Sequence, residues 1–123
     1  LEKYADYELA PLTTFTVFQQ RVINLGMQKV CDESLVKLAM NEQLPPHFDY
    51  LEGVLGHNDY FVGNALTLAD IAFASQIINM QHAGEQINAQ RWPNLAAIFE
   101  RVKALPAMQT LLQNEQAMLA SMQ

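Results

Sequence analysis

Cysteine is almost absent from this sequence of 123 residues, because Cys31 is the only one. A single cysteine can neither form an intrachain disulfide nor build a cysteine cluster for a metal ion. A composition of this kind is typical of proteins from a reducing compartment. The histidines His47, His57 and His82 are spaced too irregularly to share one metal-binding face, so we expect no metal site.

Charged residues are also scarce, at 16% of the chain, and basic residues are the minority among them. Seven Lys and Arg against thirteen Asp and Glu give a net charge of −6. A field of this sign repels phosphate backbones and anionic membranes, so we expect no nucleic acid and no membrane as a partner. Half of the residues are hydrophobic, which is enough for a buried core and argues against disorder.

Long hydrophobic runs are missing as well. No stretch reaches the roughly 18 to 20 uninterrupted apolar residues of a membrane span, since Asp70, Asn79 and Gln81 interrupt the best candidate. The first residues, LEKYADYELAP, carry charges where a secretory signal needs an apolar run. We therefore expect a cytoplasmic protein. The sequence begins without Met and in helix-like sequence, so we also expect a piece of a longer protein.

Patterns typical of β-strands are not found, because no segment alternates apolar and polar residues over a sustained length. Apolar residues instead recur at every third or fourth position, which places them on one face of a helix. We predict one all-α domain over residues 1–123, a bundle of about five helices. The expected core-facing residues are Leu9, Leu12, Phe15, Phe18, Val22 and Leu25 in the first helix, Leu35, Leu38, Ala39, Phe48, Leu51 and Leu55 in the second, and Leu95, Ile98, Phe99 and Val102 in the fourth.

One carboxylate stands in an otherwise uncharged stretch, TLADIAFASQIINM, which covers residues 67–80. The spacing Thr67-x-x-Asp70 before an apolar helix predicts a capping box, in which each side chain accepts a hydrogen bond from the backbone N–H of the other residue. Leu66 and Ile71 stand at the two positions of a hydrophobic staple around this box. We therefore assign Asp70 a structural role, and we expect the helix that starts at Thr67 to run buried through the centre of the domain.

Two stretches, FVGNALTLADIAFASQ and RWPNLAAIFERVKALPAMQ, resemble the C-terminal helical domain of the cytosolic glutathione transferases, in particular bacterial ones. In that family a G-x-x-x-(S/T)-x-A-D stretch caps the central helix, and a (Y/W)-P-N-L helix start follows. DYLEGVLG, ADYELAP and FQQRV are similar to further family segments, so the resemblance covers essentially the whole chain. It implies a homodimeric parent protein with an N-terminal thioredoxin-like domain that binds glutathione and carries a catalytic Tyr, Ser or Cys.

The resemblance implies no catalytic residue in this chain, because the catalytic side chain of the family lies in that other domain. The helical domain would supply the wall of the electrophile site and half of the dimer interface. For the wall we choose Leu12, Thr16 and Gln19, which share one face of the first helix, with an ordinary core position as the alternative for Leu12. Asp6 falls where some family members contact the glutathione of the neighbouring subunit, and a solvated surface aspartate is the alternative.

The activity implied for the parent is addition of the glutathione thiolate to a small electrophile, or reduction of a peroxide or mixed disulfide by glutathione. A non-catalytic protein-interaction module is the alternative, because transferase-like helical domains also serve as docking units and a fold does not determine a function. Tyr4 and Tyr7 are interpreted as residues of an interface. Cys31 lies beside Asp32 and Glu33, which oppose thiolate formation, so we do not expect it to act as a nucleophile.

Overall fold

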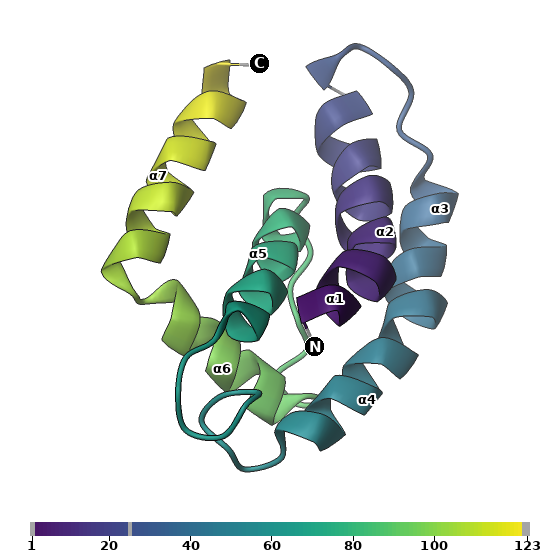
Figure 1. Ribbon diagram of the computed structural model, residues 1–123. Helices are drawn as coiled ribbons and strands as arrows, with labels where there is room; N and C mark the ends of the chain where they lie inside the picture. The colour runs from purple at the N-terminus through teal and green to yellow at the C-terminus, as the bar shows by residue number, and fades with distance from the viewer. Residues whose placement is uncertain (1, 25, 122–123) are drawn as a thin grey trace.

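The computed structural model describes residues 2–24 and 26–121, apart from the side chains of Glu2 and Asp6. Within this part of the chain the predicted all-α bundle of five helices is confirmed (Figure 1). Two of the five helices are divided by π-type turns, which are wider than α-helical turns and are labelled η. The first helix consists of α1 Glu2–Tyr4, η1 Ala5–Leu9, α2 Ala10–Leu12 and η2 Thr13–Asn24, and the second of α3 Glu33–Leu38, η3 Ala39–Gln43 and α4 Leu44–Leu55. The other three helices are α5 Leu68–His82, α6 Pro93–Lys103 and α7 Pro106–Ser121.

Helix α5 occupies the centre of the bundle, with the first helix on one side of it and α7 on the other (Figure 1). It packs against η2, α1 and α6. Seven of its residues are buried: Ala69, Asp70, Phe73, Ala74, Ile77, Ile78 and Met80. The prediction of a central buried helix is therefore confirmed. The burial of so much apolar surface in one element makes α5 the core around which the other helices are arranged.

The start of α5 carries the predicted capping box. The Asp70 side chain, 0% exposed, accepts a hydrogen bond from the Thr67 N–H at 2.8 Å through Oδ2. Its other oxygen, Oδ1, accepts one from the Phe61 N–H at 2.8 Å, a bond that local sequence spacing does not predict. Asp70 thus joins the 56–67 connection to the central helix. Leu66 is exposed while Ile71 packs against the core, so a staple between these two side chains stays a prediction.

Polar side chains join the first helix to α5 in addition to apolar packing. The Thr13 and Thr14 hydroxyls both donate to Gln76 Oε1, at 2.7 Å and 2.6 Å. Asn79 Nδ2 donates in turn to Thr14 Oγ1 at 2.8 Å. Thr13 is fully buried, and its single O–H proton is shared between Gln76 Oε1 and the Leu9 carbonyl oxygen, which lies 3.0 Å away, so the hydroxyl is satisfied within the core.

The prediction that Phe15 packs in the core is wrong, because its side chain is 68% exposed. The buried positions of the first helix are Ala10 and a series of residues four apart, Ala5, Leu9, Thr13 and Val17. This spacing follows from the π-type turns of η1 and η2, whose i→i+5 hydrogen bonds make a turn wider than the 3.6 residues of an α-helix. The buried face therefore moves away from the one that an α-helical period predicts.

The second helix departs from its predicted face in the same way. Leu35 and Leu38 are about two-fifths exposed, and the fully buried residues are Val36 and Ala39, so this part of the prediction is wrong except for Ala39. The π-type turn η3 follows directly and shifts the register before α4. Prolines stand at the start of α4, where a residue without an N–H interrupts regular bonding. Beyond them Phe48, Leu51 and Leu55 are buried as predicted.

Helix α6 receives its N-terminal cap from another helix. Glu52 of α4 accepts hydrogen bonds from the Asn94 and Leu95 N–H groups at 3.0 Å and 2.9 Å, one on each carboxylate oxygen. Asp49, one turn earlier in α4, accepts from Trp92 Nε1 at 2.7 Å. Two carboxylates of α4 therefore hold the WPNL segment. The predicted core face of α6, Leu95, Ile98, Phe99 and Val102, is buried.

Candidate functional site

The residues chosen for an electrophile-site wall lie along the first helix, but their polar groups are bonded within it. Leu12 is half-buried and packs against the core. The Thr16 hydroxyl donates to the Pro11 carbonyl oxygen at 2.8 Å, and Gln19 Nε2 donates to Asn24 Oδ1 at 3.0 Å. The structure thus leaves Thr16 and Gln19 half-buried at the helix surface and does not gather the three side chains around a common cavity.

An exposed aromatic face runs along the same helix. Tyr7 is 72% exposed and Phe15 is 68% exposed, and Pro11 between them is also exposed. Large apolar side chains in a row at a protein surface indicate a face that another molecule or domain covers. We call Tyr7, Pro11 and Phe15 the aromatic face. The apolar pattern does not predict this face, because an α-helical period assigns Phe15 to the core.

Tyr4 belongs to a cluster that joins the first helix to α4. Its hydroxyl lies 2.6 Å from His47 Nδ1, and its ring stacks on Tyr50 with ring centres 5.3 Å apart. Burial, assisted by the negative charge of Glu8, raises the pKa of the Tyr4 phenol. The phenol therefore stays protonated at neutral pH. The Asp6 side chain, chosen as a glutathione contact, lies outside the described residues.

A cleft of about 190 Å³ opens between the first helix and α7, with the end of α5 at its base. Phe18 contributes from η2, and Met118 and Leu119 contribute from α7. At the base, His82 Nε2 lies 3.2 Å from Glu115 Oε2, a contact between α5 and α7. No local motif reveals this cleft, because its walls come from three segments far apart in the chain.

Arg21 connects the first helix to the start of α3 and to the segment that follows α5. Its guanidinium pairs with Glu33 at 2.9 Å and with Glu85 at 2.7 Å, and it also donates to the Ala83 carbonyl oxygen at 3.1 Å. Arg21 and the Cys31 thiol hold the pKa of Glu33 at about 2. The thiol donates to Glu33 Oε2 at 2.9 Å, and this bond raises the pKa of Cys31.

Cys31 should become more reactive when Glu33 loses its charge. In Glu33→Gln the acceptor carboxylate is gone, the pKa of the thiol falls, and the thiolate forms at lower pH. The pH profile of Cys31 alkylation by iodoacetamide should shift toward lower pH. Glu85→Gln removes another partner of Arg21 without touching the thiol, so its profile should match the wild type. An unshifted alkylation profile for Glu33→Gln would show that the Glu33 carboxylate is not what raises the pKa of the Cys31 thiol.

Among the residues that the structure describes, no three His, Cys, Asp or Glu side chains lie close enough to hold a metal ion. Nor is any helix in that part of the chain both long enough and apolar enough to cross a membrane.

Five helices around a capped central helix match a solved protein structure. The crystal structure of a glutathione S-transferase from Rhodospirillum rubrum F11 superimposes with a TM-score of 0.76, over 87% of this chain and 47% of that one. At 18% sequence identity this likeness concerns the fold alone. The comparison of sequences is more specific than that of folds, because residues 21–115 match the family described as "Glutathione S-transferase, C-terminal domain". The chain belongs to this family.

A curated protein is also similar to this chain. The "Probable maleylacetoacetate isomerase" of Vibrio cholerae serotype O1 (strain ATCC 39315 / El Tor Inaba N16961) is 29% identical over 102 residues. The match covers 81% of this chain and 45% of the relative. The chain therefore spans about half the length of the two proteins compared here.

Proposed function

We propose that this chain is the helical half of a cytoplasmic glutathione transferase-like protein. In the parent protein it supplies one wall of the electrophile site and half of a homodimer interface. Glutathione is the co-substrate of the parent and binds mainly to an N-terminal thioredoxin-like domain. The reaction of the parent protein is conjugation of glutathione to a small electrophile, or an exchange of glutathione with such an electrophile. Membership of the transferase family and the half-length match to two relatives support this proposal.

The structural observation that supports the proposal most directly is the exposed aromatic face. Tyr7 and Phe15 expose most of their side chains, although burying one such ring contributes about 1.5 to 3 kcal/mol. Docking of the thioredoxin-like domain or of the second subunit against the first helix would recover this free energy. The same helix carries Leu12, Thr16 and Gln19, so a domain docked there would face the proposed electrophile wall.

Asp6 is proposed to contact glutathione bound by the neighbouring subunit. A carboxylate suits the ammonium group of glutathione, since charge-assisted hydrogen bonds of this kind are short and strong. Asp6 stands between Tyr4 and Tyr7 in the sequence, at the end of the first helix where the aromatic face begins. A subunit that covers the aromatic face would bring its glutathione toward Asp6.

The test uses the full-length protein that contains this chain. We expect glutathione-dependent conjugation of a chlorodinitrobenzene or glutathione-dependent reduction of a hydroperoxide, with a dimer in size-exclusion chromatography coupled to light scattering. A full-length protein that neither binds immobilised glutathione nor turns over either class of substrate would refute the enzyme proposal. That result would favour the non-catalytic interaction module.

Phe15→Glu should destabilise the full-length protein, because it places a charge in the covered aromatic face. We expect a loss of about 1.5 kcal/mol and a fall in melting temperature of roughly 4 °C. Val30→Glu is the matched control, since Val30 is an apolar residue 87% exposed in the connection before α3. Differential scanning calorimetry of both variants measures the difference. Equal melting temperatures for the two variants would show that Tyr7, Pro11 and Phe15 stay exposed to solvent in the full-length protein.

A further inference from the structure

One face of the central helix α5 is left partly uncovered by the rest of the bundle. Leu68, in the first turn of this helix, is 63% exposed. Ala72, Ser75 and Asn79 follow it at intervals of three and four residues and are half-buried. This spacing places the four side chains in one row along the helix. We call Leu68, Ala72, Ser75 and Asn79 the open face of α5.

The open face continues onto the helices on either side of α5. Asn79 lines the cleft described above together with Phe18 of the first helix and Met118 of α7. Met118 is 59% exposed, and Leu111, seven residues earlier and so on the same side of α7, is 44% exposed. Among its described residues α7 buries only Met108. An apolar surface therefore extends from the open face onto α7 and the first helix.

The polar side chains of the open face are hydrogen-bonded within the bundle. Ser75 Oγ donates to the Ile71 carbonyl oxygen at 2.9 Å, and Asn79 Nδ2 donates to Thr14 Oγ1 at 2.8 Å. A partner that covers this face would not leave these donors unpaired. It would also remove Leu68 from water, which is favourable in proportion to the apolar area covered. The open face is therefore suited to an apolar partner surface.

The chain enters the bundle beside the open face, because the first helix and α5 run side by side in the same direction. Tyr4 and Ala5 line a small pocket together with Ala69 and Phe73, which lie near the start of α5. Farther along, the threonine–glutamine hydrogen bonds described above join the same two helices. Figure 1 accordingly shows α1 near the start of α5. A domain that precedes residue 1 would be tethered next to Leu68, at a high effective concentration.

A second copy of the chain fits the open face less well. Two copies related by a two-fold axis would meet through the same surface. At Asn79 this surface is recessed, because the cleft has walls from the first helix and from α7. Two recessed surfaces cannot fill each other. The occupant therefore has to present a projecting apolar element.

We propose that the N-terminal domain of the same polypeptide docks on the open face of α5. This inference rests on the proposed function, which includes a domain before residue 1. Membership of a family described as a C-terminal domain supports such a neighbour. A projecting apolar element of the N-terminal domain covers Leu68 and Ala72 and extends between the first helix and α7 toward Asn79.

Photo-crosslinking in the full-length protein tests which molecule occupies the open face. Leu68→benzoylphenylalanine places a photoreactive group there. Leu35→benzoylphenylalanine is the matched control, because Leu35 is an exposed leucine in the first turn of α3. After irradiation and digestion, mass spectrometry should find position 68, but not position 35, joined to peptides that precede residue 1. Crosslinks from position 68 to residues 1–123 of a second copy, or no crosslink, would overturn the proposal.

A mixture of isotopically labelled and unlabelled protein separates the two subunits of a dimer. If the N-terminal domain belongs to the same polypeptide, crosslinks from position 68 join peptides with the same label. Crosslinks between a labelled and an unlabelled peptide would assign the open face to the N-terminal domain of the other subunit and so overturn the proposal.

Leu68→Glu should lower the melting temperature of the full-length protein by roughly 4 °C, because it places a charge in the covered interface. Glutamate in the first turn is compatible with α5 itself, since it lies at the positive end of the helix dipole. Leu35→Glu makes the same change in the first turn of α3 and should shift the melting temperature by no more than about 1 °C. Equal melting temperatures in calorimetry would contradict docking at Leu68.

These results are distinguishable from a failure of the proposed function. Crosslinks to the preceding residues in a protein that neither binds nor uses glutathione would support the docking and refute only the transferase activity. Glutathione-dependent turnover by a protein whose position 68 forms no such crosslink would refute only the docking.

Discussion

Replacing Asp70 with Ala should lower the free energy of unfolding by about 3 kcal/mol and the melting temperature by roughly 10 °C. The carboxylate is fully buried and accepts hydrogen bonds from the backbone N–H groups of Thr67 and Phe61, each at 2.8 Å. Alanine leaves both donors without this acceptor, and an unpaired buried donor costs about 1 to 3 kcal/mol. Urea and thermal unfolding followed by the helical circular dichroism signal measure the change.

Asp59→Ala is the matched control for this prediction. Asp59 lies in the same connection before α5. Its side chain is exposed, and its ion pair with the Arg101 guanidinium is long, at 3.9 Å. Loss of an exposed carboxylate of this kind should change stability by no more than about 0.5 kcal/mol. If Asp70→Ala behaves like Asp59→Ala, the capping role is wrong. If it abolishes glutathione binding by the full-length protein at unchanged stability, Asp70 has a chemical role instead.

The parts of the fold that depend on local sequence could be predicted. The start of α5 follows from Thr67 and Asp70, and the start of α6 from Pro93 at its first position. Asp32 caps α3 by accepting from the Ser34 N–H at 3.0 Å, and Gly56 ends α4 with a φ of +53°. Each of these signals acts within one turn of the helix, so the residues that make the contact are close in sequence.

Burial in the first two helices could be predicted only in part, because it depends on hydrogen bonding that the apolar pattern does not record. Phe15 and Leu35 fit an α-helical face, and both are exposed. The π-type turns of η2 and η3 change the number of residues per turn and so change which side chains face α5. The sequence contains prolines near these turns, but a proline alone does not predict how the chain adjusts around it.

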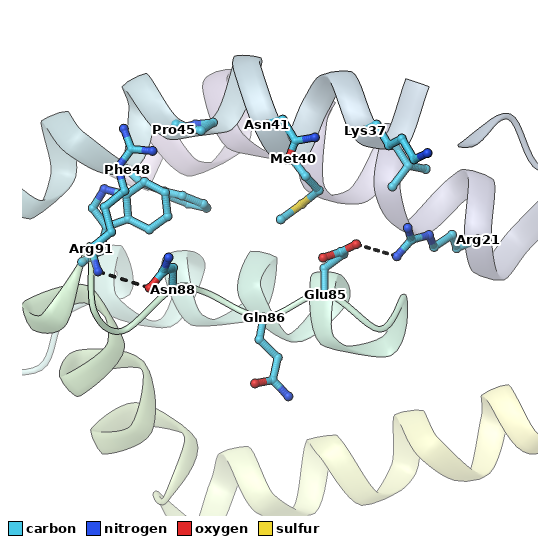
Figure 2. A pocket seen from close by; sticks show the side chains of 12 residues that line it. Arg21, Lys37, Met40, Asn41, Pro45, Phe48, Glu85, Gln86, Asn88 and Arg91 are labelled. Carbon is cyan, nitrogen blue, oxygen red and sulfur yellow. Dashed lines mark hydrogen bonds and ion pairs between the residues drawn. The ribbon is translucent and has the colours of Figure 1, made fainter. Parts of the chain in front are cut away.

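Contacts between distant segments were beyond sequence reasoning. The bond from the Phe61 N–H to Asp70 and the contact of His82 with Glu115 require the folded arrangement of separate helices. The same holds for a cavity of about 410 Å³ beside Lys37, whose walls come from the first helix, the second helix and the connection after α5 (Figure 2). For the electrophile wall, Leu12, Thr16 and Gln19 stay a prediction, because the opposing wall lies in the proposed thioredoxin-like domain.

Replacing Glu52 with Ala should cost about 2 kcal/mol of stability, because α6 would lose the cap that α4 provides. The carboxylate accepts from the Asn94 and Leu95 N–H groups, which no earlier turn of α6 can satisfy. Its negative charge also lies at the positive end of the α6 dipole. The expected cost is below that of Asp70→Ala because Glu52 is half-buried, so water can reach part of the site.

Two further variants separate the cap from loss of charge in general. Glu52→Gln keeps one acceptor oxygen and should recover roughly half of the lost stability. Glu42→Ala removes an exposed carboxylate from the same long helix, and its effect should stay within about 0.5 kcal/mol. Hydrogen exchange gives an independent measurement, since Glu52→Ala should speed exchange of the Asn94 and Leu95 amides more than that of the α5 amides. Equal acceleration in both helices would mean that Glu52 stabilises the whole bundle rather than the start of α6.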